Sequence, residues 1–496
     1  MNFDERRPID ILETIGEIIE AAREENNLLK LEESIDILST LIDNARFNQR
    51  EIGILNYFLA NVWSYIQRIK FPDEEFPLET PELEKQIIHL RIANRLLKDT
   101  NDNFKKCQIQ TNLGNLFSHI GRFSEAQEYF NQCLEIDQNF EMAIGNRGFG
   151  LYYYARVVFD ATQQFIFMQY ARKDLLNAIA SNQVYNEAKY AFAGMVKQIE
   201  SAYPLKELND FKKYKDFYKK LDKKEINYKK WSAENKLFIN PLNDILTESV
   251  VAHDYLFIPT MILKSDDKLF FHSMFNQLKQ EFVSVRFLFY ESVNSPKPHF
   301  SDKEVVLMDT LDYSDYSFTL EKIKIAFRVC YSIFDKISYF INIYLNLGLD
   351  KNRVSFRTVW YNNLDKNKGL NTKLLTTKNW AMRGLFWLSK DLHEKEFDTT
   401  IDPDAKEIAT IRNFIEHKSF KIINSFNETW TKKTETFEID RQLFYDKTFK
   451  LLKLSRSALM YLSFLVYDEE RKKSIEQSNE LTIPVNFLKI KDADKI

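Results

Sequence analysis

The sequence predicts an all-α protein in which a solenoid of short helix pairs precedes a bundle of longer helices. The chain has only 11 glycines and 11 prolines among 496 residues, and the scarcity of these turn-forming residues favours long helices. Apolar residues recur at the three-and-four spacing of one helix face over long stretches. The 41 phenylalanines and 24 tyrosines can fill large interfaces between helices. A chain of this length exceeds one hydrophobic core, so we expect two or three domains.

The composition excludes several classes of protein. Hydrophobic residues make up 44% and charged residues 28%, which is typical of a folded soluble protein. The net charge of −3 gives no global basic field, so any nucleic-acid surface must be local. Cys107, Cys133 and Cys330 are too few and too scattered for a disulfide framework, which favours a reducing cytoplasm. The charged N-terminus and the absence of a long apolar run predict neither a secretory signal nor a membrane span.

The common signatures of cofactor and metal chemistry are absent. The sequence contains no glycine-rich phosphate loop, nucleophile elbow, HExxH motif or paired CxxC motif. The seven histidines do not cluster along the chain. We therefore expect neither a cofactor nor a bound metal.

Residues 1–203 are predicted to form a helical repeat domain. The segment Cys107–Phe140 resembles a tetratricopeptide repeat, whose period is ~34 residues. Gly114 and Ala126 would let its two helices cross closely, and Gly121 would lie at the turn between them. A generic helical bundle is the alternative. A repeat solenoid would offer a concave surface to a protein or peptide partner.

The neighbouring repeats are predicted to be degenerate. The next unit begins in register at Arg147-Gly148 but has extra length before its second helix. An earlier unit from Leu59 to Ala93 is interrupted by the sequence FPDEEFPLETP. We therefore expect one clear repeat flanked by divergent ones.

Residues 204–235 are predicted to be a basic linker helix. Residues 204–231 hold ten lysines against five acidic residues, with aromatic residues interleaved. Lysines and aromatics together can hold a nucleic-acid backbone and stack bases, so Lys219, Lys220, Lys223 and Lys224 are candidate RNA-binding residues. The favoured alternative is an amphipathic helix with a solvated lysine face and a packed aromatic face.

Residues 236–496 are predicted to form the second helical domain. Residues 240–261 contain two prolines and should be irregular with short helices. A polar, hairpin-like excursion is expected near NETWTKKTETFEID. Long periodic stretches predict helices over residues 267–292, 317–349, 381–397, 404–422 and 441–474.

One helix of this domain carries a possible catalytic cluster. Arg412 and Asn413 are followed by three residues and then His417. Asn413 and His417 share a helix face, and Arg412 lies at its edge. RNA cleavage without a metal needs an acid and a base, for which histidine is suited. It also needs a cation beside the phosphate, which arginine supplies. By itself this pattern is weak evidence for catalysis, since polar residues at the end of a helix usually form a solvated face.

The wider sequence resembles a known family. The arginine, polar residue, three residues and histidine match the signature of HEPN domains. The segments NPLNDI, YSIFDKISYFIN, FRTVWY, RGLFWLSKDL and IRNFIEHK resemble, in that order, the LA2681-like HEPN subgroup. Such proteins often carry tetratricopeptide-like helices before the HEPN domain. The resemblance covers roughly residues 240–475.

The resemblance implies a homodimer whose two motifs face each other across a composite cleft. It also implies an endoribonuclease that leaves a 2′,3′-cyclic phosphate, often as a toxin or phage-defence effector, here regulated through the repeat region. The alternative is a catalytically silent HEPN-like module for dimerisation or RNA binding. A third hypothesis is a toxin controlled by a separate nucleotidyltransferase.

The resemblance also points to Asp335. This residue, in the sequence SIFDKIS, matches an acidic residue that many HEPN domains place beside the motif, where it would orient Arg412 or His417. The alternative is a helix-face acid paired with Lys336 or Lys390. Three weaker candidates are Asn342, Glu416 and Lys418.

Overall fold

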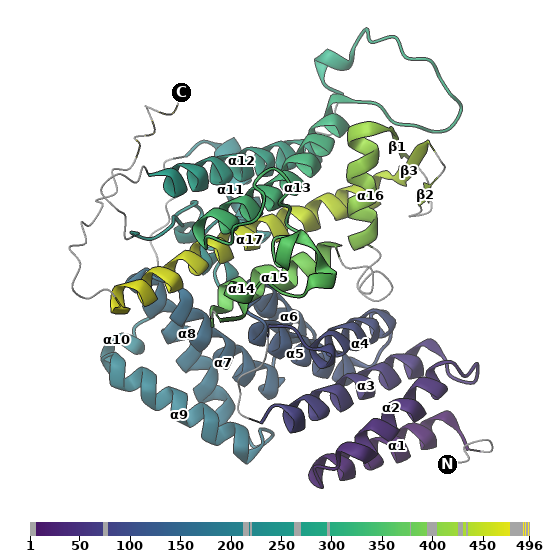
Figure 1. The fold of residues 1–496 in the computed structure, drawn as a ribbon, viewed down its shortest axis with the longest axis vertical. Coiled ribbons are helices and arrows are strands. Elements are labelled where there is room, and N and C mark those ends of the chain that lie inside the picture. The colour runs from purple at the N-terminus through teal and green to yellow at the C-terminus, as the bar shows by residue number, and fades with distance from the viewer. Residues whose placement is uncertain are drawn as a thin grey trace.

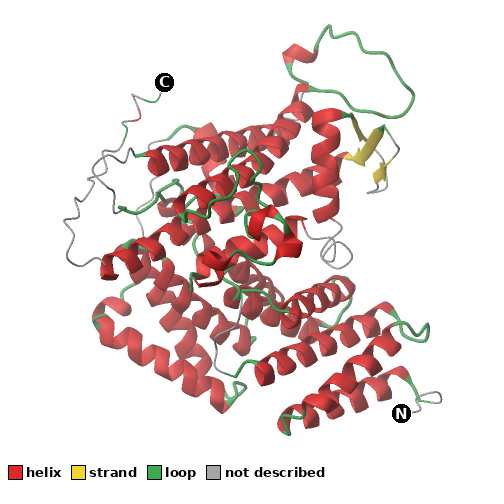
Figure 2. Cartoon of the chain, viewed as in Figure 1, coloured by secondary structure: helices red, strands yellow, loops and turns green. Residues whose placement is uncertain are grey.

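The protein is all-α apart from one small sheet (Figures 1 and 2). The structure, a computed structural model, describes residues 6–72, 78–211, 218, 221–261, 269–294, 298–376, 378–393, 404–424, 430–432, 435–476, 490, 492 and 495. The N-terminal helices form one layer, and the C-terminal helices pack across it. None of the described helices is long and apolar enough to cross a membrane.

The N-terminal layer consists of successive helix pairs. Polar caps set several of their starts: the Asn48 side chain accepts the Glu51 backbone N–H, and the Glu51 side chain accepts that of Asn48. Such a capping box satisfies two amides that have no partner within the helix. The helices are α1 (Pro8–Glu24), α2 (Leu28–Ile42), α3 (Gln49–Lys70), α4 (Pro81–Leu97), α5 (Asn103–His119), α6 (Phe123–Ile136), α7 (Glu141–Val157), α8 (Ala161–Ala180) and α9 (Asn186–Ala202).

The helix pair predicted at residues 107–140 is confirmed as α5 and α6. Gly121 lies in the turn between them with a φ of 82°, a conformation that favours glycine. A methyl group on Gly114 would lie only 2.5 Å from the Phe130 ring, so glycine permits the close crossing. The pairs α3/α4 and α7/α8 flank it. This all-helical arrangement fits the predicted repeat domain, and its assignment to the tetratricopeptide family stays an interpretation.

The predicted linker contains two short helices within its described residues. They are α10 (Leu205–Leu208) and α11 (Lys223–Glu234). Tyr228 and Trp231 of α11 pack on Tyr290, with ring centroids 5.1 and 5.2 Å apart. The predicted packed aromatic face is therefore confirmed for α11. Residues 240–261 hold the expected short helices, η2 (Pro241–Asp244) and η3 (Ser249–Val251).

Long helices build the C-terminal layer around α17, whose residues Ala458 to Leu462 are completely buried. The helices predicted at 267–292, 317–349 and 441–474 are confirmed as α12, α13 and α17. The one predicted at 381–397 corresponds to α15, and its last four residues lie outside the described part of the chain. The elements are α12 (Phe270–Val293), η4 (Phe300–Asp302), α13 (Phe318–Tyr344), η5 (Asn362–Leu364), η6 (Lys366–Lys368), α14 (Thr372–Thr376), α15 (Trp380–His393), α16 (Asp404–His417) and α17 (Arg441–Glu476).

The helix predicted over 404–422 is too long, because α16 ends at His417. The chain then enters strand β1 (Ser419–Ile423), which runs parallel to β3 (Thr436–Asp440). Strand β2 (Trp430–Lys432) pairs antiparallel with β3, which confirms the expected hairpin. The Phe420 ring stacks on Phe437 with centroids 5.9 Å apart. The apolar side chains on one face of β1 pack against a strand that lies further along the chain. A search for helical periodicity cannot identify such a partner.

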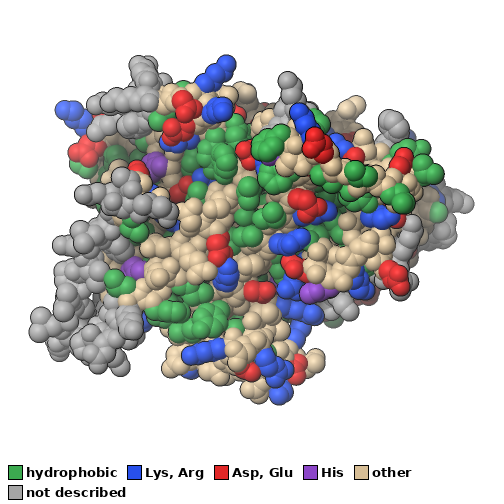
Figure 3. Space-filling view, turned by 90° about the horizontal axis from the view of Figure 1, so that it is seen from above, with side chains coloured by type: hydrophobic (Ala, Val, Ile, Leu, Met, Phe, Trp, Pro, Cys, Tyr) green, Lys and Arg blue, Asp and Glu red, His purple; other side chains and the backbone are tan. Residues whose placement is uncertain are grey.

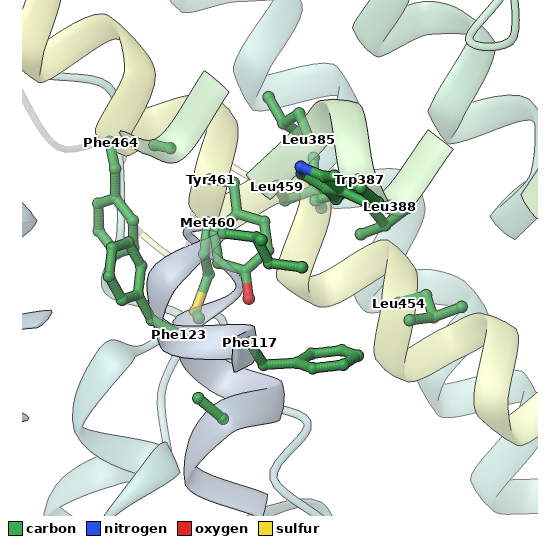
Figure 4. Close-up of a cluster of buried hydrophobic side chains, with 14 of the residues drawn as sticks. Phe117, Phe123, Leu385, Trp387, Leu388, Leu454, Leu459, Met460, Tyr461 and Phe464 are labelled. Carbon is green, nitrogen blue, oxygen red and sulfur yellow. The ribbon is translucent and has the colours of Figure 1, made fainter. Parts of the chain in front are cut away.

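The two layers share one hydrophobic core. Phe117 of α5 and Phe123 of α6 lie beside Trp387 of α15 and Tyr461 of α17 (Figure 4). The Trp387 indole donates a hydrogen bond of 3.1 Å to the backbone oxygen of Leu78. The core is thus continuous across the predicted boundary between the repeat domain and the C-terminal domain.

Candidate active site

Helix α16 carries the predicted motif and is anchored by its apolar face. Ile408, Ile411 and Phe414 are at most 3% exposed. Because residues three and four apart share a helix face, this anchor fixes the direction of the residues between them. The side chains of Arg412 and Asn413 therefore point away from the core, on opposite sides of the buried face formed by Ile411 and Phe414.

Arg412 lies in a groove between α16 and α13. The groove has a volume of about 400 Å³. The Arg412 guanidinium lies over the Tyr331 ring, with its central carbon 5.1 Å from the ring centroid. A cation over an aromatic face is stabilised by the ring quadrupole. The described lining residues are Arg328, Tyr331, Ser332, Asp335, Lys336, Tyr339, Lys351, Val354, Arg412 and Glu416.

Asp335 and Arg412 line the same groove, as expected from the sequence. Burial raises the pKa of the Asp335 carboxyl, against the opposing effects of the Phe356 backbone N–H and the Arg412 charge. The Phe356 N–H donates to the Asp335 carboxylate at 3.2 Å. The alternative lysine partners bind elsewhere: Lys336 pairs with Glu281 at 2.5 Å, and Lys390 pairs with Glu79 and Glu84.

Two further residues, Tyr331 in the wall of the groove and His393 in contact with its ring, were not predicted from the sequence. Burial, with a contribution from the Asp335 charge, raises the pKa of Tyr331 to about 12, so it stays a neutral phenol. Its ring meets His393 edge-on, with centroids 6.0 Å apart. Burial lowers the pKa of His393 to about 4. The spacing of Tyr331 and Asp335, one helical turn apart, was the available signal for the tyrosine.

Asn413 and His417 occupy a different face of α16. Both are exposed, and neither is among the described residues that line the groove. Glu416 does line it, with its carboxylate 3.8 Å from the Arg328 Nε. A single chain therefore gathers Arg412, Asp335 and Glu416 in the groove and leaves Asn413 and His417 directed to solvent.

The weaker candidates have other surroundings. Asn342 is buried and exchanges two hydrogen bonds with the backbone of Leu349, at 3.0 and 3.1 Å. The Lys418 ammonium lies 5.0 Å from the centroid of the Phe414 ring. Lys223 and Lys224 are exposed at the start of α11 and are not among the groove residues. Lys219 and Lys220 lie outside the described residues.

The side chains of the groove and of the adjoining α16 face suit acid–base chemistry on an anion. They comprise a fixed guanidinium, a carboxyl group whose pKa is raised, a phenol and an exposed imidazole. A guanidinium can stabilise charge on a phosphate, and an imidazole can move a proton. In the described part of the chain, no three histidine, cysteine or acidic side chains converge to hold a metal ion.

The sequence matches the family model described as LA2681-like HEPN over residues 262–469. The C-terminal half of the chain contains a HEPN-type domain. The match includes α16, most of α17 and the motif residues Arg412, Asn413 and His417. No curated protein and no solved structure matched the chain.

An arm extends from this HEPN domain between α12 and α13. It comprises residues 298–317, and four of its side chains are highly exposed: Val306 (97%), Met308 (86%), Leu311 (84%) and Tyr313 (83%). Its return segment pairs with β1, where the Asp315 N–H donates to the Ile422 oxygen at 2.8 Å. The face that carries the arm shows several groups of hydrophobic side chains (Figure 3). The arm is thus rooted on the strand that directly follows His417.

Proposed function

We propose that the protein is a metal-independent endoribonuclease that leaves 2′,3′-cyclic phosphate ends. The observation that carries this proposal is the position of Arg412, fixed over Tyr331 in a groove that also holds Asp335. In this proposal Arg412 binds the phosphate that becomes negatively charged during cleavage. His417 exchanges the protons of the 2′-hydroxyl and of the leaving 5′-oxygen. Asn413 orients the phosphate.

The proposal includes a homodimer formed through the HEPN domain. Asn413 and His417 face solvent, so a second copy can present the same residues across a shared cleft. The arm supports this arrangement, because it exposes large apolar side chains beside the strand that follows His417. Exposed apolar patches of this kind mark interaction surfaces. A two-fold axis would bring two such surfaces together.

The test is cleavage of RNA by the purified full-length protein in EDTA. His417→Ala and Arg412→Ala should each lower the rate by about 100-fold or more, the usual contribution of an acid–base or charge-stabilising group. The exposed His253, which lies outside the groove, gives the matched control His253→Ala. Removal of the cyclic phosphate by an end-processing enzyme would identify the product. Full activity of a folded His417→Ala variant would refute the proposal.

Asp335 has a positioning role in this proposal, through the charge of Arg412. Asp335→Asn keeps the oxygen that accepts the Phe356 N–H but removes the negative charge. It should therefore lower the cleavage rate and alter the pH profile while leaving the melting temperature nearly unchanged. A variant that loses stability and activity together would instead mark Asp335 as a structural residue.

The second candidate function is a silent HEPN-like module that binds RNA or a second copy without cleavage. The contact of Arg412 with Tyr331 of its own chain favours it, since that contact alone would account for the arginine. Wild-type protein that binds RNA, survives the arginine and histidine substitutions unchanged and cleaves nothing would establish this alternative.

The cellular role that we propose is that of a cytoplasmic toxin or phage-defence effector controlled through the N-terminal repeats. Its support is the core shared by the repeat helices and the HEPN domain, through which a protein or peptide on the repeat surface can act on α15. Expression of the wild-type chain should slow bacterial growth, and expression of His417→Ala should not. Equal toxicity of the two would refute a nuclease-based role.

A further inference from the structure

A second cavity lies between the repeat helices and the HEPN domain. It has a volume of about 420 Å³ and is formed by α4, α5 and α6 on one side and by α15, α16 and α17 on the other. Its described lining residues include eight lysine and arginine side chains and three carboxylates, and one of these cations, Arg456, is paired with the buried Asp244 at 2.6 Å. We call it the cationic cavity. The protein has a net charge of −3, so this concentration of positive charge is local.

A buried ion-pair network forms the floor of the cationic cavity. Asp391 accepts two hydrogen bonds from Arg91, at 3.0 and 2.8 Å, and another from Arg122. Arg122 also pairs with Glu125 at 2.9 Å. The two guanidiniums outweigh burial and hold the pKa of Asp391 well below its usual range. The floor is therefore ionised and fixed, and it joins the repeat helices to α15.

The walls and the rim of the cationic cavity carry its excess positive charge. Arg95 and Lys98 are exposed at the rim, and within the described chain neither forms a salt bridge. Lys236 lies in the wall, where its ammonium donates to the Leu246 carbonyl at 3.3 Å. Burial lowers the pKa of Lys236, so nearby carboxylates do not fully compensate its charge. An anion in the cavity would supply that compensation.

We propose that the cationic cavity binds a small molecule that carries several phosphate groups. Phosphate is the ligand that arginine forks and lysine ammonium groups bind best together. The volume falls within the ~300–1,000 Å³ range of small-molecule sites. Tyr129, which is partly buried, also lines the cavity and offers an aromatic surface to a nucleobase, whereas the Phe117 ring is already covered by the guanidiniums of Arg91 and Arg122. A nucleotide and an inorganic polyphosphate share the chemistry that the cavity recognises.

The occupant would contact the helix that carries the motif. Ile408 of α16 lines the cationic cavity, and Arg412 lies one turn further along the same helix. Asp391 on the floor is two residues from His393, whose ring meets Tyr331 beneath Arg412. Ligand binding should thus stabilise α16. Any consequence for RNA cleavage rests on the proposed function, whereas ligand binding itself does not.

The test is a calorimetric titration of the full-length protein with ATP and with tripolyphosphate, at physiological salt concentration. The variant Arg95→Gln/Lys98→Gln removes the two rim cations. The matched control Lys85→Gln/Lys197→Gln removes two exposed lysines that do not line the cavity. The rim variant should weaken binding about tenfold, and the control less than about twofold. Hydrogen exchange in residues 408–417 should slow on binding.

The outcomes separate the ligand sources. Tighter binding of ATP than of tripolyphosphate identifies a nucleotide site in which Tyr129 contacts the base, and equal binding identifies a polyphosphate site. Absence of binding by either probe, or equal weakening in the rim and control variants, overturns the proposal. These binding measurements use no RNA, so their outcome does not depend on whether the protein cleaves RNA.

Discussion

Replacement of Gly384 by alanine should destabilise the contact between the repeat helices and the HEPN domain. Gly384 lies in α15, where its missing side chain leaves room for the turn that contains Gly121. A methyl group at Gly384 would collide with the backbone oxygen of Gly121. The obstructing atom is backbone, so relief requires one of two packed segments to move.

The expected magnitude follows from two opposing effects. Overpacking of a close contact costs about 1–3 kcal/mol. Alanine is a better helix former than glycine by about 0.5–1 kcal/mol, which offsets part of that cost. Because the clash is with backbone, the upper part of the range applies, and we expect a net loss of about 1–2 kcal/mol. At position 194, in α9, an added methyl group meets no atom within 4 Å. Gly194→Ala should therefore gain about 0.5–1 kcal/mol.

Thermal unfolding monitored by tryptophan fluorescence measures the difference, since Trp380 and Trp387 lie in the same helix as Gly384. The entropy of unfolding of 496 residues is about 1 kcal/mol/K, so Gly384→Ala should melt about 1–2 °C below wild type and Gly194→Ala about 0.5–1 °C above it. If the melting temperature of Gly384→Ala equals or exceeds that of Gly194→Ala, then helix α15 and the turn at Gly121 are not in close contact at this glycine.

The remaining predictions concern pH and association. Burial lowers the pKa of His393 to about 4 from a value near 6.5 in the unfolded chain. The unfolded state therefore binds the proton first as pH falls, and stability that is present above pH ~6.5 declines until pH ~4. Denaturant unfolding should show a loss of about 2 kcal/mol between pH 6.5 and 5 from this histidine, and His393→Gln should flatten that slope; an unchanged slope would assign the dependence to other groups. Val306→Asp/Met308→Asp in the arm should shift the protein from dimer to monomer in light scattering. The control Leu29→Asp/Tyr190→Asp, at two exposed apolar side chains of the repeat helices, should not, and a dimer that persists in both variants would exclude the arm from the interface.

The sequence predicted the elements whose pattern is long and local. Helices α12, α13 and α17 follow directly from apolar periodicity, and the α5/α6 pair follows from its small residues at fixed positions. The parallel pairing of β1 with β3 could not be predicted in this way. The five residues of β1, three of them apolar, follow a helix directly and are compatible with its continuation, and only the pairing with β3 at Phe437 shows that they form a strand.

The groove likewise contains relations that the sequence predicts, between residues one helical turn apart, and relations that only the packing of distant segments determines. The i, i+4 relation of Tyr331 and Asp335 is visible in the sequence, and so is that of Arg412 and Glu416. From the sequence, Arg412 is expected at the edge of the helix face that Asn413 and His417 share. The structure instead aligns it with Glu416, because packing of Ile411 and Phe414 fixes the rotation of α16. The contact of Gly121 with Gly384 likewise joins positions too far apart for any local pattern.

The rotation of α16 constrains how the proposed nuclease can work. Successive residues of an α-helix point about 100° apart, so Arg412 and His417 differ in direction by about 140°. No rotation of α16 can therefore bring both into the groove of one chain. If Arg412 and His417 act on the same phosphate, either the RNA must wrap over the edge of the helix or the histidine must come from a second copy. The exposed arm beside His417 favours the second route, because it offers apolar surface for a partner where the motif is incomplete. Mixing an inactive Arg412→Ala protomer with an inactive His417→Ala protomer should then restore part of the activity, since one of the two composite sites in the mixed dimer has both Arg412 and His417 intact.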